Sequence, residues 1–255
     1  MPMQNYSHYL EELPVEIQSA LDPLTGTWQH PLINQETLPH LIDHTLLKPT
    51  VSGAEIQDLC VQAKEYGFIA VCIHGIWAPL AKQFLLDTNV RLACVANFPL
   101  GSMDIPTQLV EIKNLSSQCD EIDFVLPFSL VKQKKYEELY SHLKQIRELA
   151  PKNVLKIILE TAELSEEEKV KSSAVSVASG FDFLKTSTGF ASAGASLEDV
   201  KLLRQIAGNK ASVKASGGIR DWETLVSMVE AGANRIGCSS GVQIMQNKVS
   251  ESGAY

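Results

Sequence analysis

One lysine occupies an unusual place, at the end of a short apolar run. In residues 182–189, Lys185 follows two apolar residues and precedes a turn of small hydroxyl residues. Burying an ammonium group is costly, so a lysine in such a place either pairs with a carboxylate or has a lowered pKa. The free amine of a lysine with a lowered pKa is a nucleophile for carbonyl compounds. A structural lysine that reaches solvent or pairs with an acid is the alternative for Lys185 taken alone.

A second lysine, Lys214, stands at the corresponding place of the next apolar run, residues 212–214. Neighbouring strands lie about 4.8 Å apart, so we expect the two side chains to come close together. Two ammonium groups at that range disfavour each other's charged form and lower the pKa of at least one of them. The pair therefore indicates an activated amine, and two lysines that each pair with a separate acid are the alternative.

Carboxylates are expected on the inward faces of other strands. The alternation of side chains along a strand puts Glu121 and Asp123 on one face, and Asp43 is a second inward aspartate. Lys156 and Glu160 are expected to form an inward charge pair. Each of these residues alone is more simply a structural ion-pair partner. Together with the two lysines they predict a polar barrel interior in which Asp123 holds a water molecule and moves protons.

Three turns rich in glycine and serine or threonine follow the last three predicted strands, at residues 186–189, 216–218 and 237–241. Backbone N–H groups in such turns and at helix N-termini bind phosphate. The loops after strands seven and eight are a frequent phosphate site in α/β barrels. The turns therefore predict a phosphorylated substrate.

The elements that position these residues read as a parallel α/β fold, because short β-branched or apolar runs alternate with segments of helical periodicity. Strands are predicted at residues 40–45, 68–73, 91–97, 121–125, 154–160, 182–186, 212–214 and 235–237. Helices are predicted at residues 53–66, 76–86, 105–118, 135–149, 165–179, 196–206 and 221–230, with a last one starting near Ser239. Eight repeats predict a closed (β/α)8 TIM barrel, since a doubly wound open sheet usually has about five or six strands. In that fold the chemistry lies where strands end and loops begin.

The chain of 255 residues has the length of a single barrel, which typically takes about 250. Residues 1–39 are expected to form an N-terminal extension packed on the barrel, with a helix over residues 15–21. Residues 40–245 are expected to form the barrel, and residues 246–255 a flexible C-terminal tail.

Composition argues against several classes of function. A net charge of −8 without a basic stripe disfavours nucleic-acid binding, and no apolar run is long enough to span a bilayer. A cytoplasmic protein is therefore expected. Five scattered cysteines and six histidines without ligand spacing disfavour a disulfide framework and a metal site, and no motif for an organic cofactor is present. The expected partners are a small phosphosugar and aldehydes, and the sequence leaves open a homodimer or larger homo-oligomer.

The ordered motifs of the chain resemble the deoxyribose-phosphate aldolase family, the class I aldolases that form a Schiff base. The matching segments are L-I-D-H-T-L-L-K-P at residues 41–49, A-V-C-I at 70–73, A-N-F-P-L-G at 96–101, D-E-I-D at 120–123, L-K-I-I-L-E-T at 155–161, F-L-K-T-S-T-G at 183–189, V-K-A-S-G-G at 213–218 and R-I-G-C-S-S-G at 235–241.

The resemblance implies that Lys185 forms the Schiff base, that Lys214 perturbs it and that Asp123 is the general acid and base acting through a water molecule. It implies supporting roles for Asp43 and Lys156. It also implies a substrate-binding set, with the phosphate held by the glycine and serine turns: Cys72, Thr186, Gly189, Gly217, Gly218, Gly237, Ser239 and Ser240.

The resemblance further implies reversible retro-aldol cleavage of 2-deoxy-D-ribose 5-phosphate without a metal or organic cofactor. The alternatives are a Schiff-base barrel aldolase for a longer phosphosugar and a catalytically silent sugar-phosphate-binding barrel. Two departures stand out: Phe190 replaces a lysine that assists the phosphate in some members, and the N-terminal extension has no counterpart in the family core. The terminal Tyr255 resembles the tyrosine that enters the site in some members.

Overall fold

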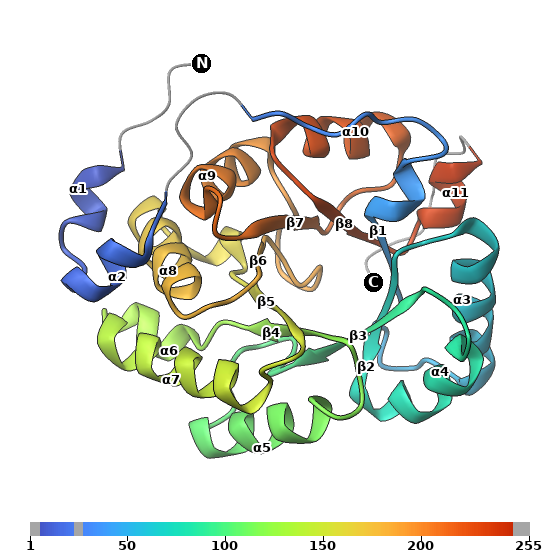
Figure 1. The fold of residues 1–255 in the computed structure, drawn as a ribbon, viewed down its shortest axis with the longest axis horizontal. Coiled ribbons are helices and arrows are strands. Elements are labelled where there is room, and N and C mark those ends of the chain that lie inside the picture. The colour runs from blue at the N-terminus through green and yellow to red at the C-terminus, as the bar shows by residue number, and fades with distance from the viewer. Residues whose placement is uncertain (1–5, 23–27, 247–255) are drawn as a thin grey trace.

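A closed barrel of parallel strands forms the centre of the computed structural model, which describes residues 6–22 and 28–246 (Figure 1). The strands of this described part are β1 (Ile42–Thr45), β2 (Ala70–His74), β3 (Arg91–Ala96), β4 (Glu121–Val125), β5 (Val154–Ile158), β6 (Phe183–Lys185), β7 (Ser212–Ser216) and β8 (Arg235–Cys238). They pair in chain order, and β8 closes the barrel on β1. The predicted (β/α)8 barrel is confirmed.

Helices surround the barrel on the outside (Figure 1). They are α3 (Gly53–Tyr66), α4 (Ala78–Leu85), α5 (Ile105–Leu115), α7 (Tyr136–Leu149), α8 (Glu166–Ala178), α9 (Leu197–Ala207), α10 (Trp222–Ala231) and α11 (Gly241–Met245). Three predicted first residues, Ser165, Ser196 and Asp221, are N-caps whose side chains accept a backbone N–H of the first turn. These caps fix where each helix begins.

Some predicted boundaries were wrong. The strand predicted at 40–45 begins later, because Leu38–Leu41 forms a 3-10 turn (η1) with Pro39 in it. The strand predicted at 154–160 ends at Ile158, because Glu160 adopts a left-handed backbone with a φ of 51° before the turn η3 (Thr161–Glu163). The short helix α6 (Phe128–Lys132) was not predicted.

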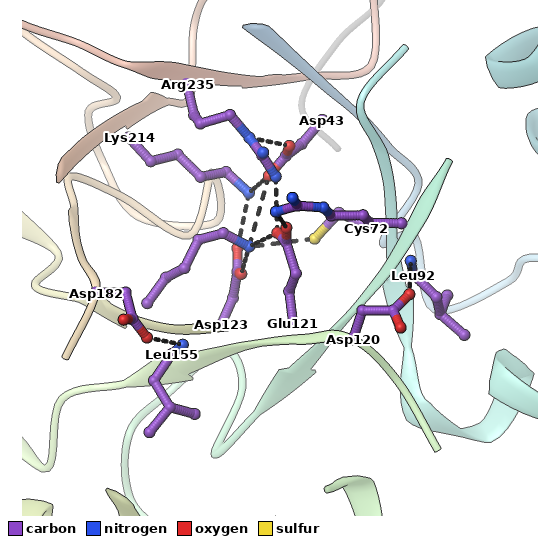
Figure 2. Close-up of polar contacts among 12 residues, drawn as sticks. Asp43, Cys72, Leu92, Asp120, Glu121, Asp123, Leu155, Asp182, Lys214 and Arg235 are labelled. Carbon is purple, nitrogen blue, oxygen red and sulfur yellow. Dashed lines mark hydrogen bonds and ion pairs between the residues drawn. The ribbon is translucent and has the colours of Figure 1, made fainter. Parts of the chain in front are cut away.

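Polar side chains just before several strands fix the strand register. Asp120 accepts a hydrogen bond from the Leu92 N–H at 2.8 Å, and Asp182 accepts one from the Leu155 N–H at 2.8 Å (Figure 2). Each bond satisfies a backbone donor at the start of the neighbouring strand. The register that results decides which side chains meet inside the barrel.

The two faces of each strand have different surroundings. In β3, Cys94 belongs to the large core between the strands and the helices, whereas Ala93 and Val95 lie in a small cluster with Leu47 and Cys72. This alternation is the one that parallel barrels require. The small cluster leaves the rest of the barrel interior to polar side chains.

The described part of the N-terminal extension packs on the outer helices. Helices α1 (Ser7–Leu10) and α2 (Val15–Ala20) lie beside α8 (Figure 1). Lys171 of α8 is buried and pairs with Glu12, and Trp28 donates a hydrogen bond to the Val229 carbonyl at 3.0 Å. The domain boundaries remain a prediction, and the predicted tail from residue 247 onward, with Tyr255, lies outside the described residues. Within the described ranges, no helix has the length and apolar character needed to cross a membrane.

His142 is a buried histidine whose surroundings disfavour its protonated form. His142 lies in the core beside Gln108, with 2.7 Å between His142 Nε2 and Gln108 Oε1, while His142 Nδ1 is buried and has no hydrogen-bond partner among the described residues. Protonation would place a buried N–H where nothing accepts it. Burial accordingly lowers the pKa of His142 to about 4.

We therefore predict that unfolding becomes easier as the pH falls from about 6.5 toward 4, because the unfolded chain binds a proton that the folded chain excludes. The contribution of His142 to the slope approaches about 1.4 kcal/mol per pH unit. Chemical denaturation of the protein and of His142→Gln across this range measures it. A variant that keeps the full pH dependence of the parent would contradict the assignment to His142.

Candidate active site

Seven charged side chains of the described residues fill the middle of the barrel. They come from six strands, and all are buried: Asp43, Glu121, Asp123, Lys156, Lys185, Lys214 and Arg235. The strand register sets their heights, since Asp123 pairs with Lys156 and Lys185 with Lys214. The structure therefore brings together all five residues predicted to be catalytic.

The Asp123 carboxylate is the centre of this cluster. Its Oδ2 accepts hydrogen bonds from Lys185 Nζ and Lys214 Nζ, both at 2.8 Å, and its Oδ1 accepts one from Lys156 Nζ at 2.6 Å. The Cys72 thiol lies 3.9 Å from Oδ2, so Cys72 touches the same carboxylate (Figure 2). One carboxylate thus holds three ammonium groups at hydrogen-bond distance.

A second set of ion pairs lies behind Asp123. Asp43 accepts a hydrogen bond from Lys214 and one from Arg235 Nε, the latter at 2.8 Å (Figure 2). Glu121 binds Arg235 Nη2 at 2.7 Å and also pairs with Lys156. Glu121 and Arg235 were not predicted to be site residues. Their positions on the inward face of a strand could have identified them as site residues. Glu121 was predicted to lie on the inward face, but no role was assigned to it.

The balance of charges in the cluster favours one neutral lysine. Three carboxylates face four cations among the buried groups, so one positive charge is in excess. Lys214 contacts two carboxylates, and Lys156 contacts three when Asp43 at 3.7 Å is included. In the described part of the chain Lys185 pairs with Asp123 alone. Lys185 is therefore the ammonium group with the least compensation for its burial.

The pKa shifts follow these contacts. Burial lowers the pKa of Lys185 more than attraction to Asp123 raises it, and repulsion from Lys214 lowers it further. Burial also acts on Lys214, but Asp123 and Asp43 hold its pKa well above the ordinary value. Burial would raise the pKa of Asp123, whereas the three lysines hold it well below the usual range. The site thus combines a lysine whose pKa is lowered, a lysine whose pKa is raised and a carboxylate whose pKa is lowered.

The predicted Lys156–Glu160 charge pair is wrong. Lys156 points to Asp123 and Glu121 inside the barrel. Glu160 lies beyond the end of β5, where the left-handed turn of the backbone directs its side chain to Thr188. A continuous strand would have kept both side chains on one face, but β5 ends too early for that.

Four of the residues predicted to bind phosphate line one cavity of about 180 Å³: Gly189, Gly217, Gly218 and Ser239. The three glycines have φ angles of 91°, 86° and 80°, which residues with a side chain rarely adopt. Gly217 also packs against Gly194, where an added Cβ would come within 2.9 Å of the Gly194 Cα. Glycine is thus required here both for conformation and for space.

Arg220 lines the same cavity and was missed from the sequence. It comes two residues after the Ser-Gly-Gly turn, and a pattern of glycine and serine predicts backbone donors but gives no signal for a charged side chain. A guanidinium group binds phosphate by charge and by paired hydrogen bonds. Arg220 can therefore supply the positive charge that Phe190 does not.

The remaining predicted substrate-binding residues lie outside the lining of this cavity. Thr186 bridges β6 and β7, since its hydroxyl accepts the Ser216 N–H at 3.1 Å. Gly237 lies within β8, where a Cβ would meet the Lys214 Cε at 2.9 Å, so this glycine leaves room for the lysine. Ser240 is buried. Contact of these three residues with substrate remains a prediction.

An apolar wall lies on the other side of Asp123. Val95 pairs in register with Asp123 and clusters with Leu47, Cys72 and Phe98. Phe98 in turn meets Phe190 edge to face, with 5.4 Å between the ring centroids. A ligand held at Lys185 would thus have an apolar side at the wall and the cavity of about 180 Å³ at the glycine turns.

The match to known proteins covers most of the chain. Residues 38–247 match the family model described as DeoC/LacD family aldolase. The chain is 45% identical to the deoxyribose-phosphate aldolase of Caldanaerobacter subterraneus over 81% of this chain and 91% of that protein. It is 41% identical to the deoxyribose-phosphate aldolase of Carboxydothermus hydrogenoformans over 86% of this chain and 98% of that protein.

Solved structures agree with this match. A Coccidioides immitis protein considered to be a deoxyribose-phosphate aldolase superposes with a TM-score of 0.84 at 33% identity, over 96% of this chain and 98% of that one. The tetrameric deoxyribose phosphate aldolase of Aeropyrum pernix gives a TM-score of 0.76 at 31% identity, over 91% of this chain and 95% of that one. With its barrel, its buried lysine and carboxylate cluster and these relatives, the chain belongs to the DeoC/LacD aldolase family.

Proposed function

We propose that this chain catalyses the reversible retro-aldol cleavage of 2-deoxy-D-ribose 5-phosphate to D-glyceraldehyde 3-phosphate and acetaldehyde. The observation that carries the proposal is the buried amine of Lys185, whose pKa is lowered and whose carboxylate partner is shared with two other lysines. The relatives that match most of the chain are named for the same reaction.

The reaction begins at the Lys185 amine. Nζ adds to the C1 aldehyde of the open-chain sugar, and loss of water gives a protonated imine. A base removes the proton of the C3 hydroxyl, the C2–C3 bond breaks, and its electron pair moves into the imine to form an enamine. D-Glyceraldehyde 3-phosphate leaves at this point. Protonation of the enamine at C2 and hydrolysis of the imine then release acetaldehyde and restore the amine.

The neighbours of Lys185 are proposed to transfer protons, to supply positive charge and to position the reacting groups. Asp123 is proposed to act as the general base and acid through a water molecule, since its carboxylate lies 2.8 Å from Lys185 Nζ. Lys214 keeps a positive charge beside the reacting amine and holds the other hydrogen bond to Asp123 Oδ2. Asp43 and Lys156 are proposed to support them by fixing Lys214 and Asp123 in place.

The two sides of the site fit the two ends of the substrate. The phosphate is proposed to bind at the cavity lined by the glycine turns, Ser239 and Arg220. The apolar wall of Leu47, Cys72, Val95 and Phe98 lies at the other side of Asp123, where the two-carbon fragment would form. A longer phosphosugar would need additional hydroxyl-binding groups on that side, which favours the small aldehyde.

The cellular location and the oligomeric state also belong to the proposal. A cytoplasmic location, expected from the sequence, is supported by the free thiols of all five cysteines. Assembly into a homodimer or larger oligomer is supported by the tetrameric relative from Aeropyrum pernix.

The assignment of the nucleophile predicts the outcome of imine trapping. With acetaldehyde and borohydride, the protein should gain a reduced adduct on Lys185, and Lys185→Ala should lose it. Lys214→Ala should keep some adduct but lose turnover severely, by about a hundredfold or more, because the general acid–base system is disturbed. Peptide mass spectrometry locates the adduct.

A matched control is Lys201→Ala, which removes an exposed lysine of α9 and should leave both trapping and turnover unchanged. An adduct on Lys214 would reverse the assigned roles. Sugar-phosphate binding without any adduct or turnover would favour the silent binding barrel.

The assignment of the phosphate site predicts a selective loss of affinity. Ser239→Glu places a carboxylate in the cavity beside Arg220, so it should repel the phosphate and compete for the guanidinium. The KM for deoxyribose 5-phosphate should rise about tenfold or more, whereas kcat/KM for free deoxyribose should change much less. Steady-state kinetics with both sugars measure this ratio, and equal losses would mean that the glycine turns are structural.

A further inference from the structure

A buried carboxylate that the proposed chemistry does not use lies next to the catalytic turn. Glu160 is only 4% exposed and adopts a left-handed backbone with a φ of 51°. This conformation is unfavourable for a residue with a side chain, and burial of a carboxylate is costly. Such a combination persists only where its surroundings compensate for it.

Among the described residues, the hydrogen bonds that compensate for the burial of Glu160 come from one residue of the turn that follows Lys185. Glu160 Oε2 accepts the Thr188 N–H at 3.2 Å and also the Thr188 hydroxyl. The Thr188 hydroxyl oxygen in turn accepts the Phe190 N–H at 3.0 Å. The direction of each bond is fixed, because a backbone N–H can only donate and the hydroxyl proton is then left for the carboxylate.

This chain of bonds encloses Gly189. Thr188 and Phe190 are both held to Glu160, directly or through one hydroxyl, and Gly189 between them has a φ of 91°. Gly189 lines the anion cavity. The left-handed conformation of a glycine has no side chain to enforce it, so the bonds on either side hold it in place.

The other end of the same segment is held independently. Lys185 pairs in register with Lys214, and its carbonyl accepts the Leu159 N–H at 2.9 Å. The Thr186 carbonyl accepts the Thr161 N–H at 3.0 Å. Loss of the Glu160 side chain would therefore release the phosphate end of the segment and leave the amine end in its strand.

We propose that Glu160 is a positioning residue that fixes the turn at residues 188–190 and thereby keeps Gly189 in the wall of the phosphate cavity. The inference rests on the proposed function, since it concerns recognition of the phosphorylated substrate. It assigns to Glu160 selectivity for phosphate rather than a part in bond breaking.

Two substitutions distinguish the role of Glu160 as a hydrogen-bond acceptor from the role of its negative charge. In Glu160→Ala the acceptor is lost, so the KM for deoxyribose 5-phosphate should rise about tenfold, while kcat/KM for free deoxyribose falls much less. In Glu160→Gln the amide oxygen can still accept both bonds from Thr188, so the preference for the phosphorylated sugar should be largely restored.

Thr188→Val interrupts the same chain of bonds from the other side and keeps the shape of the side chain. It should reproduce part of the selective loss of Glu160→Ala, since the bond from the N–H of residue 188 to Glu160 remains. The double variant should be no worse than Glu160→Ala, because both substitutions break one connection. Should Glu160→Ala fail to fold, Thr188→Val alone carries the comparison of the two sugars.

Equal losses on both sugars in folded variants would overturn the inference. An unchanged preference together with a displaced pH profile of kcat would also overturn it, because Glu160 would then act on the charge of Lys185. If the unaltered protein does not cleave deoxyribose 5-phosphate, the proposed function falls first, and normal cleavage in that control separates the two failures.

Discussion

The site depends on the sharing of the Asp123 carboxylate among three lysines. A buried carboxylate with a single ammonium partner would form a closed ion pair, and the lysine would stay protonated. Here Lys214 and Lys156 each have a further carboxylate, whereas Lys185 has Asp123 alone within the described residues. Because the compensation is unequal, burial lowers the pKa of Lys185, whereas the neighbouring carboxylates raise the pKa of Lys156 and of Lys214. The same carboxylate remains charged and available for proton transfer.

The barrel produces this arrangement through strand register. Inward side chains of neighbouring parallel strands stand at the same level, as Lys185 and Lys214 do on β6 and β7. Asp43 and Arg235 enter from β1 and β8, where the barrel closes, and complete the ion pairs behind Asp123. An open sheet would leave these strands at its two edges, so closure of the barrel is a condition of the chemistry.

Much of this could be read from the sequence, because it depends on periodicity. Alternation along strands placed Lys185, Lys214 and Asp123 correctly inside the barrel, and residues of the glycine turns line one cavity together. Errors arose where the backbone departs from regular structure. The left-handed conformation of Glu160 ended β5 early and changed the partner of that side chain. The place of Arg220 in the cavity and the pairing of Arg235 with Glu121 depend on contacts between segments that are distant in the sequence. Periodicity does not reveal such contacts.

The most direct test of the shared carboxylate is a titration of the lysine amines by nitrogen NMR in the unaltered protein and in Lys214→Ala. Lys185 should titrate below the ordinary value of 10.5 and below Lys156 and Lys214. In Lys214→Ala the pKa of Lys185 should rise, because a positive neighbour is removed and one competitor for Asp123 Oδ2 is lost. A Lys185 amine that titrates at or above its ordinary value in the unaltered protein, or that does not respond to the loss of Lys214, would contradict the account.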